Sequence, residues 1–284
     1  NIIKKDSLFR RQILETNALE TIIKQTDSLY SYADCHKLIE DLMQRLRNLG
    51  DLHSKFKIYQ PELKKGYAEE EENVPPEILK IENYIYVKMS SFDGTNETEI
   101  VDFSQDLHDG VSGLHRKEIK GYIIDLRDNP GGNMDPMILS LGFLIEKNPC
   151  AYFTFSEGKQ HSWGYQNGTY YYNNEKVYSI KKPLKLQMKV PVAILINEKT
   201  ASSAEMLIIS LLDKKVHLFG STTKNRTTGN AVYKLEDKSK LVLSTCKLTD
   251  LDGKDYLEGI KPDTFVSDQN ILQEAIKWLE SYQG

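Results

Sequence analysis

The strongest constraint on this chain is an apolar run at residues 190–197, followed by the sequence Thr-Ala-Ser-Ser-Ala-Glu-Met at 200–206. The run is rich in β-branched residues and indicates a buried strand, and the apolar stretch at 206–212 indicates a helix after a short turn. A serine in such a turn lies beside free helix N-terminal N–H groups, which can stabilise an oxyanion while the hydroxyl attacks. The pattern also fits an ordinary helix N-cap, because Ser and Thr are common there.

Composition indicates a globular protein. The chain has 284 residues, of which 39% are hydrophobic and 27% charged, so a substantial core is expected. A net charge of −4 gives no reason to expect a nucleic-acid partner. The three cysteines show neither metal-ligand spacing nor a disulfide framework. No apolar run is long enough to cross a bilayer, but residue 1 is Asn rather than Met, which leaves room for a signal or membrane anchor before it.

Helical and strand patterns alternate along most of the chain and favour an α/β core with largely parallel strands. The pattern predicts strands at residues 84–89, 121–126, 216–219, 232–235 and 241–246, and helices at 100–114, 137–145 and 271–279.

The N-terminal region differs from this core. Residues 1–50 carry apolar side chains at three- and four-residue spacing and predict a small helical subdomain that ends at Gly50, with 51–284 forming the core. Residues 57–80 look irregular, and the acidic run at 69–72 is expected to be an exposed loop. This stretch is too short for a separate peptide-binding domain.

Residues 151–182 form an aromatic β insertion between a predicted helix and the next strand. Nine Tyr, Phe and Trp residues cluster there with interspersed glycines, which indicates β-hairpins. Two interpretations stay open: a sheet that packs on its own aromatic side chains, or a cap that grips an extended peptide.

A second turn follows the predicted strand at 121–126, with the sequence Arg-Asp-Asn-Pro-Gly-Gly-Asn at 127–133. A strand, a Gly-Gly turn and a helix can aim backbone N–H groups at an anion. A tight turn that needs positive φ angles would explain the glycines equally well.

Two segments together carry a family resemblance: Asp-Leu-Arg-Asp-Asn-Pro-Gly-Gly at 125–132 and Thr-Ala-Ser-Ser-Ala-Glu at 200–205. With Gly-Ile-Lys-Pro-Asp at 259–263, they resemble the tail-specific, or C-terminal processing, serine proteases, a family that includes the core of tricorn protease. The resemblance covers residues 49–266. It implies a ClpP/crotonase-like α/β protease core, here with an N-terminal helical subdomain and a β-hairpin cap insertion.

The resemblance also implies roles for individual residues. The family nucleophile lies three residues before the glutamate, which favours Ser202 over Ser203. The backbone N–H groups of Ser203 and of the turn at Gly131 and Gly132 would then form the oxyanion hole.

The general base has two candidates, because the family uses two kinds. Processing proteases use a lysine about 25 residues after the serine, a spacing that rests on the resemblance; here Lys224 is displaced from that position, and Arg226 cannot lose its proton. Tricorn-like members take a histidine from a short Asp/Gly-x-His-Ser turn, which Asp-Leu-His-Ser at 51–54 matches. We therefore assign His53, whose residue type titrates near neutral pH.

A third catalytic residue is also implied, since tricorn-like members place a carboxylate near the closing motif. Glu258 is the best match, although the spacing is one residue short, and Asp255 is the alternative. An ordinary surface carboxylate would look the same. No metal or other cofactor is implied.

The sequence thus predicts a serine peptidase that cleaves extended peptides or polypeptide C-terminal regions through an acyl-enzyme. The short chain most resembles the nisin-resistance branch of the family, which implies lantibiotic cleavage outside the membrane by an anchored, cell-envelope protein. The alternatives are a Ser-Lys protease that uses Lys224 and an inactive peptide-binding protein of the same fold.

Overall fold

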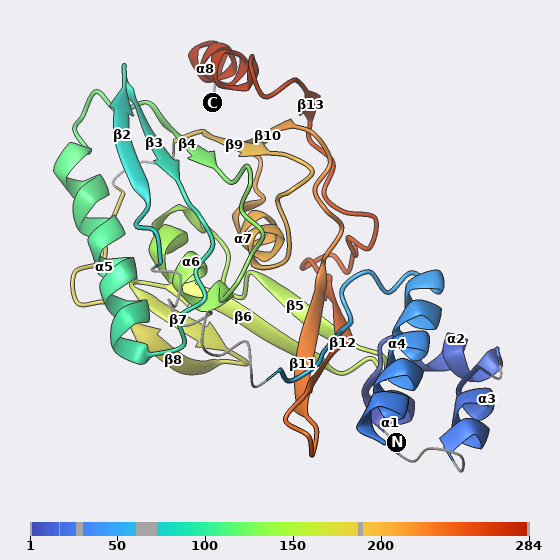
Figure 1. Ribbon diagram of the computed structural model, residues 1–284. Helices are drawn as coiled ribbons and strands as arrows, with labels where there is room; N and C mark the ends of the chain where they lie inside the picture. Colours follow the sequence, from blue (N-terminus) through green and yellow to red (C-terminus); the bar gives the residue numbers. More distant parts are fainter. Residues whose placement is uncertain (1, 17, 27–30, 61–72, 187–189, 283–284) are drawn as a thin grey trace. The chain divides into compact units, whose positions relative to one another are not determined.

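The computed structural model describes residues 2–16, 18–26, 31–60, 73–186 and 190–282 (Figure 1). The chain forms two compact units. The first contains Asn1–Glu72, Phe153–Gln160 and Thr228–Leu248, and the second contains Asn73–Tyr152, His161–Thr227 and Thr249–Gly284. The acidic run at 69–72, which we expect to be an exposed loop, lies outside the described residues.

The first unit joins four helices to antiparallel strands. Its elements are α1 (Ile2–Asp6), α2 (Arg10–Glu15), α3 (Ala18–Gln25), α4 (Tyr32–Asn48), β1 (Lys55–Lys57), β11 (Thr228–Lys234) and β12 (Lys240–Thr249). Strand β12 pairs with both β1 and β11. Fully buried Ile13, Leu46 and Leu243 belong to a core that draws on helices and strands. The helical pattern of residues 1–50 is confirmed by α1 to α4.

Helix α4 ends in a Schellman motif at the predicted glycine. Gly50 has a φ of 98° and donates its N–H to the Arg47 carbonyl at 3.0 Å. Asp51 donates its N–H to the Leu46 carbonyl, also at 3.0 Å. These are the two bonds by which such a cap satisfies the last helical carbonyls. The cap fixes the direction in which the chain enters the turn at 51–54.

The second unit is built on a six-stranded sheet in the order β13-β10-β9-β4-β3-β2. Its elements are β2 (Glu77–Ile81), β3 (Tyr84–Lys88), α5 (Glu97–Leu114), β4 (Gly121–Asp125), α6 (Met134–Leu141), η3 (Gly142–Leu144), β9 (Val192–Ile196), α7 (Ser203–Leu211), β10 (Val216–Gly220), β13 (Thr264–Phe265) and α8 (Ile271–Ser281). All pairs are parallel except β2 with β3. The predicted α/β class is therefore confirmed.

Helices cover both faces of this sheet (Figure 1). Helix α8 buries Ile271 and Ala275 against Ile123 of β4 and Leu195 of β9. Helices α5, α6 and α7 lie on the opposite face. Because β4 and β9 are buried on both faces, their sequences are mainly apolar, and the buried Asp125 at the end of β4 is paired with Arg127. Ligands of such sheets bind outside the carboxyl ends of the strands, where the turns after β4 and β9 lie.

The aromatic insertion forms β5 (Ala151–Phe155), β6 (Gln160–Gln166), β7 (Thr169–Tyr172) and β8 (Glu175–Ser179). Strands β6, β7 and β8 pair as an antiparallel meander, as the hairpin pattern predicts. Trp163 and Tyr170 are 1% exposed, and the indole N–H of Trp163 donates to the Ser210 hydroxyl of α7 at 2.8 Å. These contacts favour packing as the role of at least these two aromatic side chains.

The sequence pattern predicts no strand at β1, β2 or β13, of which β2 is the longest. Residues 57–80 are expected to be irregular, but residues 77–81 form β2 at the edge of the sheet. The segment follows two prolines and is partly exposed along its length, so it lacks the continuous apolar pattern of β4 and β9. Its pairing with β3, rather than its own pattern, makes it a strand.

The α4 cap can be tested with two glycine substitutions. Gly50→Ala is expected to lower the free energy of unfolding by about 1–2 kcal/mol, because an L-residue is strained in this left-handed conformation. Gly113→Ala is the control: this glycine lies within α5 with open space at its Cβ position, so alanine should stabilise by about 0.5–1 kcal/mol. Urea unfolding of the two variants measures both changes, and a stabilising Gly50→Ala would contradict the cap.

Candidate active site

Ser202 occupies a strained position between β9 and α7. Its φ of 56° and ψ of −118° are unusual for a residue with a side chain, and α7 begins at the next residue. The side chain is half-buried. A serine held on a sharp strand-to-helix turn is the arrangement that presents a nucleophilic hydroxyl in other hydrolase folds. Such strain persists only where the surroundings fix it.

The turn after β4 provides part of that fixation. The Thr200 hydroxyl donates to the Leu126 carbonyl at 2.8 Å, and the Ala201 N–H donates to the Asn129 carbonyl at 2.9 Å. The Asn129 side chain donates to the Met89 carbonyl at 2.9 Å. The two turns singled out in the sequence therefore lie side by side.

The glycines of the first turn are required by these close approaches. A Cβ at Gly131 would lie 2.7 Å from the Ser202 Cβ, and a Cβ at Gly132 would lie 2.2 Å from the Phe92 carbonyl oxygen. Both glycines also have positive φ angles, of 101° and 124°. Gly131 and Gly132 thus allow one backbone to approach another, as the tight-turn interpretation requires.

The backbone donors of the two turns are not equivalent. The Gly131 N–H donates to the Asn129 side-chain oxygen at 2.9 Å. Within the described part of the chain, the N–H groups of Gly132 and Ser203 have no acceptor. The Ser203 nitrogen would lie 2.9 Å from a Cβ built on Gly131, so it borders the glycine turn. Of the three predicted oxyanion donors, Ser203 and Gly132 remain available, and Gly131 instead shapes the turn.

Glu205, the glutamate of the Thr-Ala-Ser-Ser-Ala-Glu segment, is a buried carboxylate. It accepts the Ser202 N–H at 2.8 Å, the Arg226 N–H at 2.9 Å and the Thr223 hydroxyl. Burial raises the pKa of Glu205, and these hydrogen bonds oppose the rise only in part. The signal was present in the sequence, since a Ser followed three residues later by Glu is a capping-box pattern.

Lys224 and Arg226 lie in the same unit as Ser202. The Lys224 backbone N–H donates to the Thr200 carbonyl at 2.9 Å, and its side chain is exposed. A lysine acts as a base near neutral pH only when burial or nearby cations lower its pKa. Its exposed position gives the lysine mechanism no support.

Glu258 also lies in the second unit. Its side chain is 89% exposed and forms an ion pair with Lys261 at 3.6 Å. No hydrogen bond joins it to Ser202 among the residues that the structure describes. Asp255, the alternative, forms a β-bridge with Thr249. The third catalytic residue therefore stays a prediction.

His53 belongs to the first unit and is 9% exposed. Its ring nitrogen Nδ1 lies 2.9 Å from the Thr228 hydroxyl, and its backbone N–H donates to the Asp51 carboxylate at 3.2 Å. The ring is therefore held in a defined orientation. Since Ser202 belongs to the other unit, its pairing with His53 stays a prediction.

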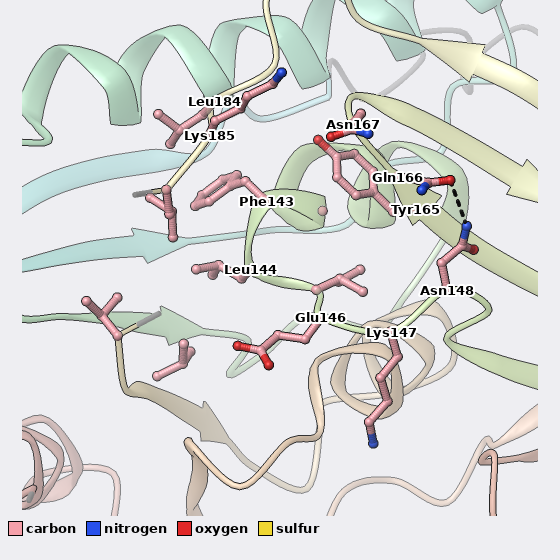
Figure 2. A pocket seen from close by; sticks show the side chains of 15 residues that line it. Phe143, Leu144, Glu146, Lys147, Asn148, Tyr165, Gln166, Asn167, Leu184 and Lys185 are labelled. Atoms are coloured by element: carbon pink, nitrogen blue, oxygen red, sulfur yellow. Dashed lines mark hydrogen bonds between the residues drawn. The ribbon is translucent and has the colours of Figure 1, made fainter. Parts of the chain in front are cut away.

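A cavity of about 610 Å³ lies elsewhere in the second unit (Figure 2). Phe143, Tyr165 and Leu184 line it, and Asn148 and Gln166 form a hydrogen bond at 3.5 Å on its wall. Ser202, Gly131 and Gly132 are not among its lining residues. This cavity is therefore not part of the candidate active site. Among the residues given a position, no cluster of His, Cys, Asp or Glu could hold a metal ion.

Comparisons with known proteins bear on this site. The sequence model of peptidase family S41 matches residues 83–266, a range that includes both turns and Glu258 but not His53. The nisin-resistance protein of Lactococcus lactis subsp. lactis is 27% identical over 264 residues, which is 91% of this chain and 78% of that protein. The carboxy-terminal processing protease CtpA of Bacillus subtilis (strain 168) is 31% identical over 185 residues, or 63% of this chain, and the match spans only 36% of CtpA.

Solved structures agree with these matches. A lipoprotein from Streptococcus agalactiae superposes with a TM-score of 0.73 at 25% identity, covering 98% of this chain and 92% of that one. A putative peptidase from Parabacteroides merdae has a TM-score of 0.58 at 18% identity, covering 93% and 91%, and supports the fold alone.

The pH dependence of stability tests the burial of Glu205. Because its pKa is raised in the folded state, the native protein binds this proton more tightly than the unfolded chain. The free energy of unfolding should therefore fall as the pH rises from 4.5, the ordinary value, through the raised pKa. Glu205→Gln should remove that part of the slope, whereas Glu236→Gln, at an exposed position, should not. Urea midpoints measured across this pH range give the slope of stability against pH for each protein. Equal slopes in the wild type and Glu205→Gln would contradict a raised pKa of Glu205.

Proposed function

Since the chain belongs to peptidase family S41, we propose that it is a serine peptidase in which Ser202 is the nucleophile and His53 the general base. The observation that carries the proposal is the strained backbone of Ser202 next to two available N–H groups, those of Ser203 and Gly132. These features match what acyl transfer needs: a hydroxyl presented on a sharp strand-to-helix turn and fixed donors for the oxyanion.

The proposed reaction proceeds in two halves. The Ser202 hydroxyl attacks the peptide carbonyl carbon while His53 accepts its proton, and the N–H groups of Ser203 and Gly132 stabilise the negative oxygen. The intermediate collapses to an acyl-enzyme as His53 returns the proton to the leaving amine. Water then attacks the acyl-enzyme with the same base, releasing the acid and restoring Ser202. Glu258 is the proposed third residue, and Asp255 its alternative.

The proposed substrate is a flexible peptide, cut near its C-terminus, and specifically a lantibiotic-type antimicrobial peptide. The match to the nisin-resistance protein supports this, because it extends over 91% of this chain, whereas the match to CtpA covers the shared peptidase region only. The similar lipoprotein from Streptococcus agalactiae supports a cell-envelope location with an anchor before residue 1. None of the helices placed by the structure has the length and apolar character to span a bilayer.

Two other functions stay open. One is a Ser-Lys peptidase that uses Lys224, which the exposure of this lysine disfavours. The other is a protein that binds peptides without cleaving them, because a fold does not fix a function. In that case wild type and Ser202→Ala would bind a peptide equally well and neither would cut it.

Single substitutions separate these mechanisms. Ser202→Ala and His53→Ala are each expected to lower kcat by about 10⁴-fold or more, since triad residues act as a unit. Lys224→Ala should retain activity within a few-fold of wild type. Hydrolysis of an extended fluorogenic peptide measures kcat, and labelling by a fluorophosphonate should be lost in Ser202→Ala. Loss of activity in Lys224→Ala with retention in His53→Ala would assign the base to the lysine.

The substrate can be tested with nisin and a linear control. Nisin incubated with the wild type should yield a fragment truncated near its C-terminus in the mass spectrum, and Ser202→Ala should leave it intact. A linear peptide of matched length and charge, without thioether rings, should be cut more slowly. Rapid cleavage of the linear peptide with intact nisin would contradict lantibiotic specificity while leaving the peptidase assignment in place.

A further inference from the structure

Asp51 is a buried carboxylate directly beside His53 in the first unit. It is 1% exposed, and the Schellman cap of α4 fixes its backbone. One oxygen accepts the N–H groups of His53 and Ser54, at 3.2 and 2.9 Å, and the Ser244 hydroxyl at 2.8 Å. The other oxygen accepts the Ser54 hydroxyl at 2.6 Å. Its hydrogen-bond donors are thus neutral amides and hydroxyls.

Two hydroxyls connect this carboxylate with the imidazole ring. The Ser244 oxygen lies 3.3 Å from the Thr228 hydroxyl oxygen, which in turn lies 2.9 Å from His53 Nδ1. Thr228 opens β11 and Ser244 lies in β12, and a β-bulge between Gly229 and Asn230 shifts the register between these strands. Bulges re-aim side chains, and here both hydroxyls face the turn at 51–54.

The direction of each hydrogen bond between Asp51 and the His53 ring follows from the acceptor at one end, the Asp51 carboxylate. An ionised carboxylate only accepts, so Ser244 donates its single hydroxyl proton to Asp51. The Asn230 side-chain oxygen is the other acceptor near Ser244, at 3.2 Å, and would also draw that proton away from Thr228. Ser244 can then only accept from Thr228, so both contacts of the Thr228 hydroxyl are hydrogen bonds only if Thr228 donates to Ser244. With its own proton used, Thr228 can only accept from His53, so Nδ1 carries the hydrogen.

We propose that Asp51 acts as a positioning residue that fixes the proton of His53 on Nδ1 through Ser244 and Thr228, so that Nε2 is the basic nitrogen. The orienting partner of one ring nitrogen decides the protonation of the other. In serine proteases a carboxylate that touches the imidazole usually fixes its tautomer. Here the carboxylate of Asp51 acts on the His53 ring through the hydroxyls of Ser244 and Thr228, which we call the relay. The catalytic meaning of the tautomer rests on the proposed function, but the tautomer itself does not.

The tautomer can be measured directly in protein labelled with ¹⁵N-histidine. At alkaline pH, where ordinary histidines are neutral, the two ring nitrogens of His53 should give one protonated signal, Nδ1, and one unprotonated signal, Nε2. The chain contains six histidines, so the His53→Gln spectrum identifies the signals. A wild-type spectrum with the proton on Nε2 would overturn the proposal without any variant.

Ser244→Ala is the decisive variant, because Ser244 does not touch the ring. Without it, the Thr228 hydroxyl can donate to Nδ1 as well as accept, so both tautomers should appear. Thr228→Ser keeps a hydroxyl in place and should retain the wild-type tautomer. Ser54→Ala is the comparison: it removes a hydroxyl donor of the same carboxylate and the acceptor of the Ser244 backbone N–H, but it keeps the hydroxyls of Ser244 and Thr228, so it shows whether a general disturbance of the turn changes the tautomer. A single, unchanged tautomer in folded Ser244→Ala would overturn the relay.

Kinetics separate this inference from the proposed function. Ser244→Ala should lower kcat about 10- to 100-fold with little change in KM, as is usual for residues that orient a functional ligand or base. Thr228→Ser, which keeps the hydroxyl, should retain most of the wild-type kcat. Failure of His53→Ala to affect hydrolysis would reject the proposed function yet leave the tautomer result standing. If His53→Ala abolishes hydrolysis but the His53 tautomer is unchanged in Ser244→Ala, only the relay is rejected.

Discussion

The buried carboxylate of Glu205 joins two segments of the second unit, the serine turn and the loop after β10. It binds the N–H of Ser202, the N–H of Arg226 and the hydroxyl of Thr223. The same Thr223 hydroxyl accepts the N–H of Ile260 at 2.8 Å, within the Gly-Ile-Lys-Pro-Asp segment. Glu205 therefore joins the serine turn to the loop after β10, and Thr223 joins that loop to the closing motif.

That anchor also accounts for the strained serine. A residue in a sparsely populated backbone region costs about 1–3 kcal/mol and persists only when its neighbours determine it. Two hydrogen bonds fix the backbone conformation of Ser202. Glu205 accepts the Ser202 N–H, and the N–H of the preceding Ala201 donates to the Asn129 carbonyl. Gly131 can approach because it lacks a Cβ. The strained backbone of Ser202 is thus that of the residue whose hydroxyl the proposed reaction uses.

The sequence carried enough information for the main elements but not for the long-range contacts. Continuous apolar runs predicted β4 and β9, and the glycine at position 50 predicted the end of α4. Strand β2 was missed because its own pattern is half-exposed and only its pairing partner makes it a strand. The sequence alone could not show that the Gly131 N–H donates to the Asn129 side chain, which leaves the N–H groups of Gly132 and Ser203 as the available donors.

The relay beside His53 lay even further beyond sequence reasoning. Thr228 is 175 positions from His53, and neither Thr228 nor Ser244 belongs to a recognisable motif. The sequence did contain Asp51 within the Asp-Leu-His-Ser turn, but there the aspartate was only part of a match. Its function as an acceptor becomes apparent only in the structure, where Ser244 of β12 donates to it and Thr228 of β11 lies between Ser244 and His53.

The choice between lysine and histidine as base depends on solvation. A lysine becomes a base near neutral pH when a low-dielectric site or a neighbouring cation disfavours its charged form. The Lys224 side chain is exposed, so it does not lie in such a low-dielectric site. Arginine cannot take over, because the guanidinium keeps its proton in any protein environment. Histidine needs no such shift, and His53 already has a buried ring with one nitrogen tied to a hydroxyl. The physical chemistry of the available residues therefore favours a histidine base for this peptidase.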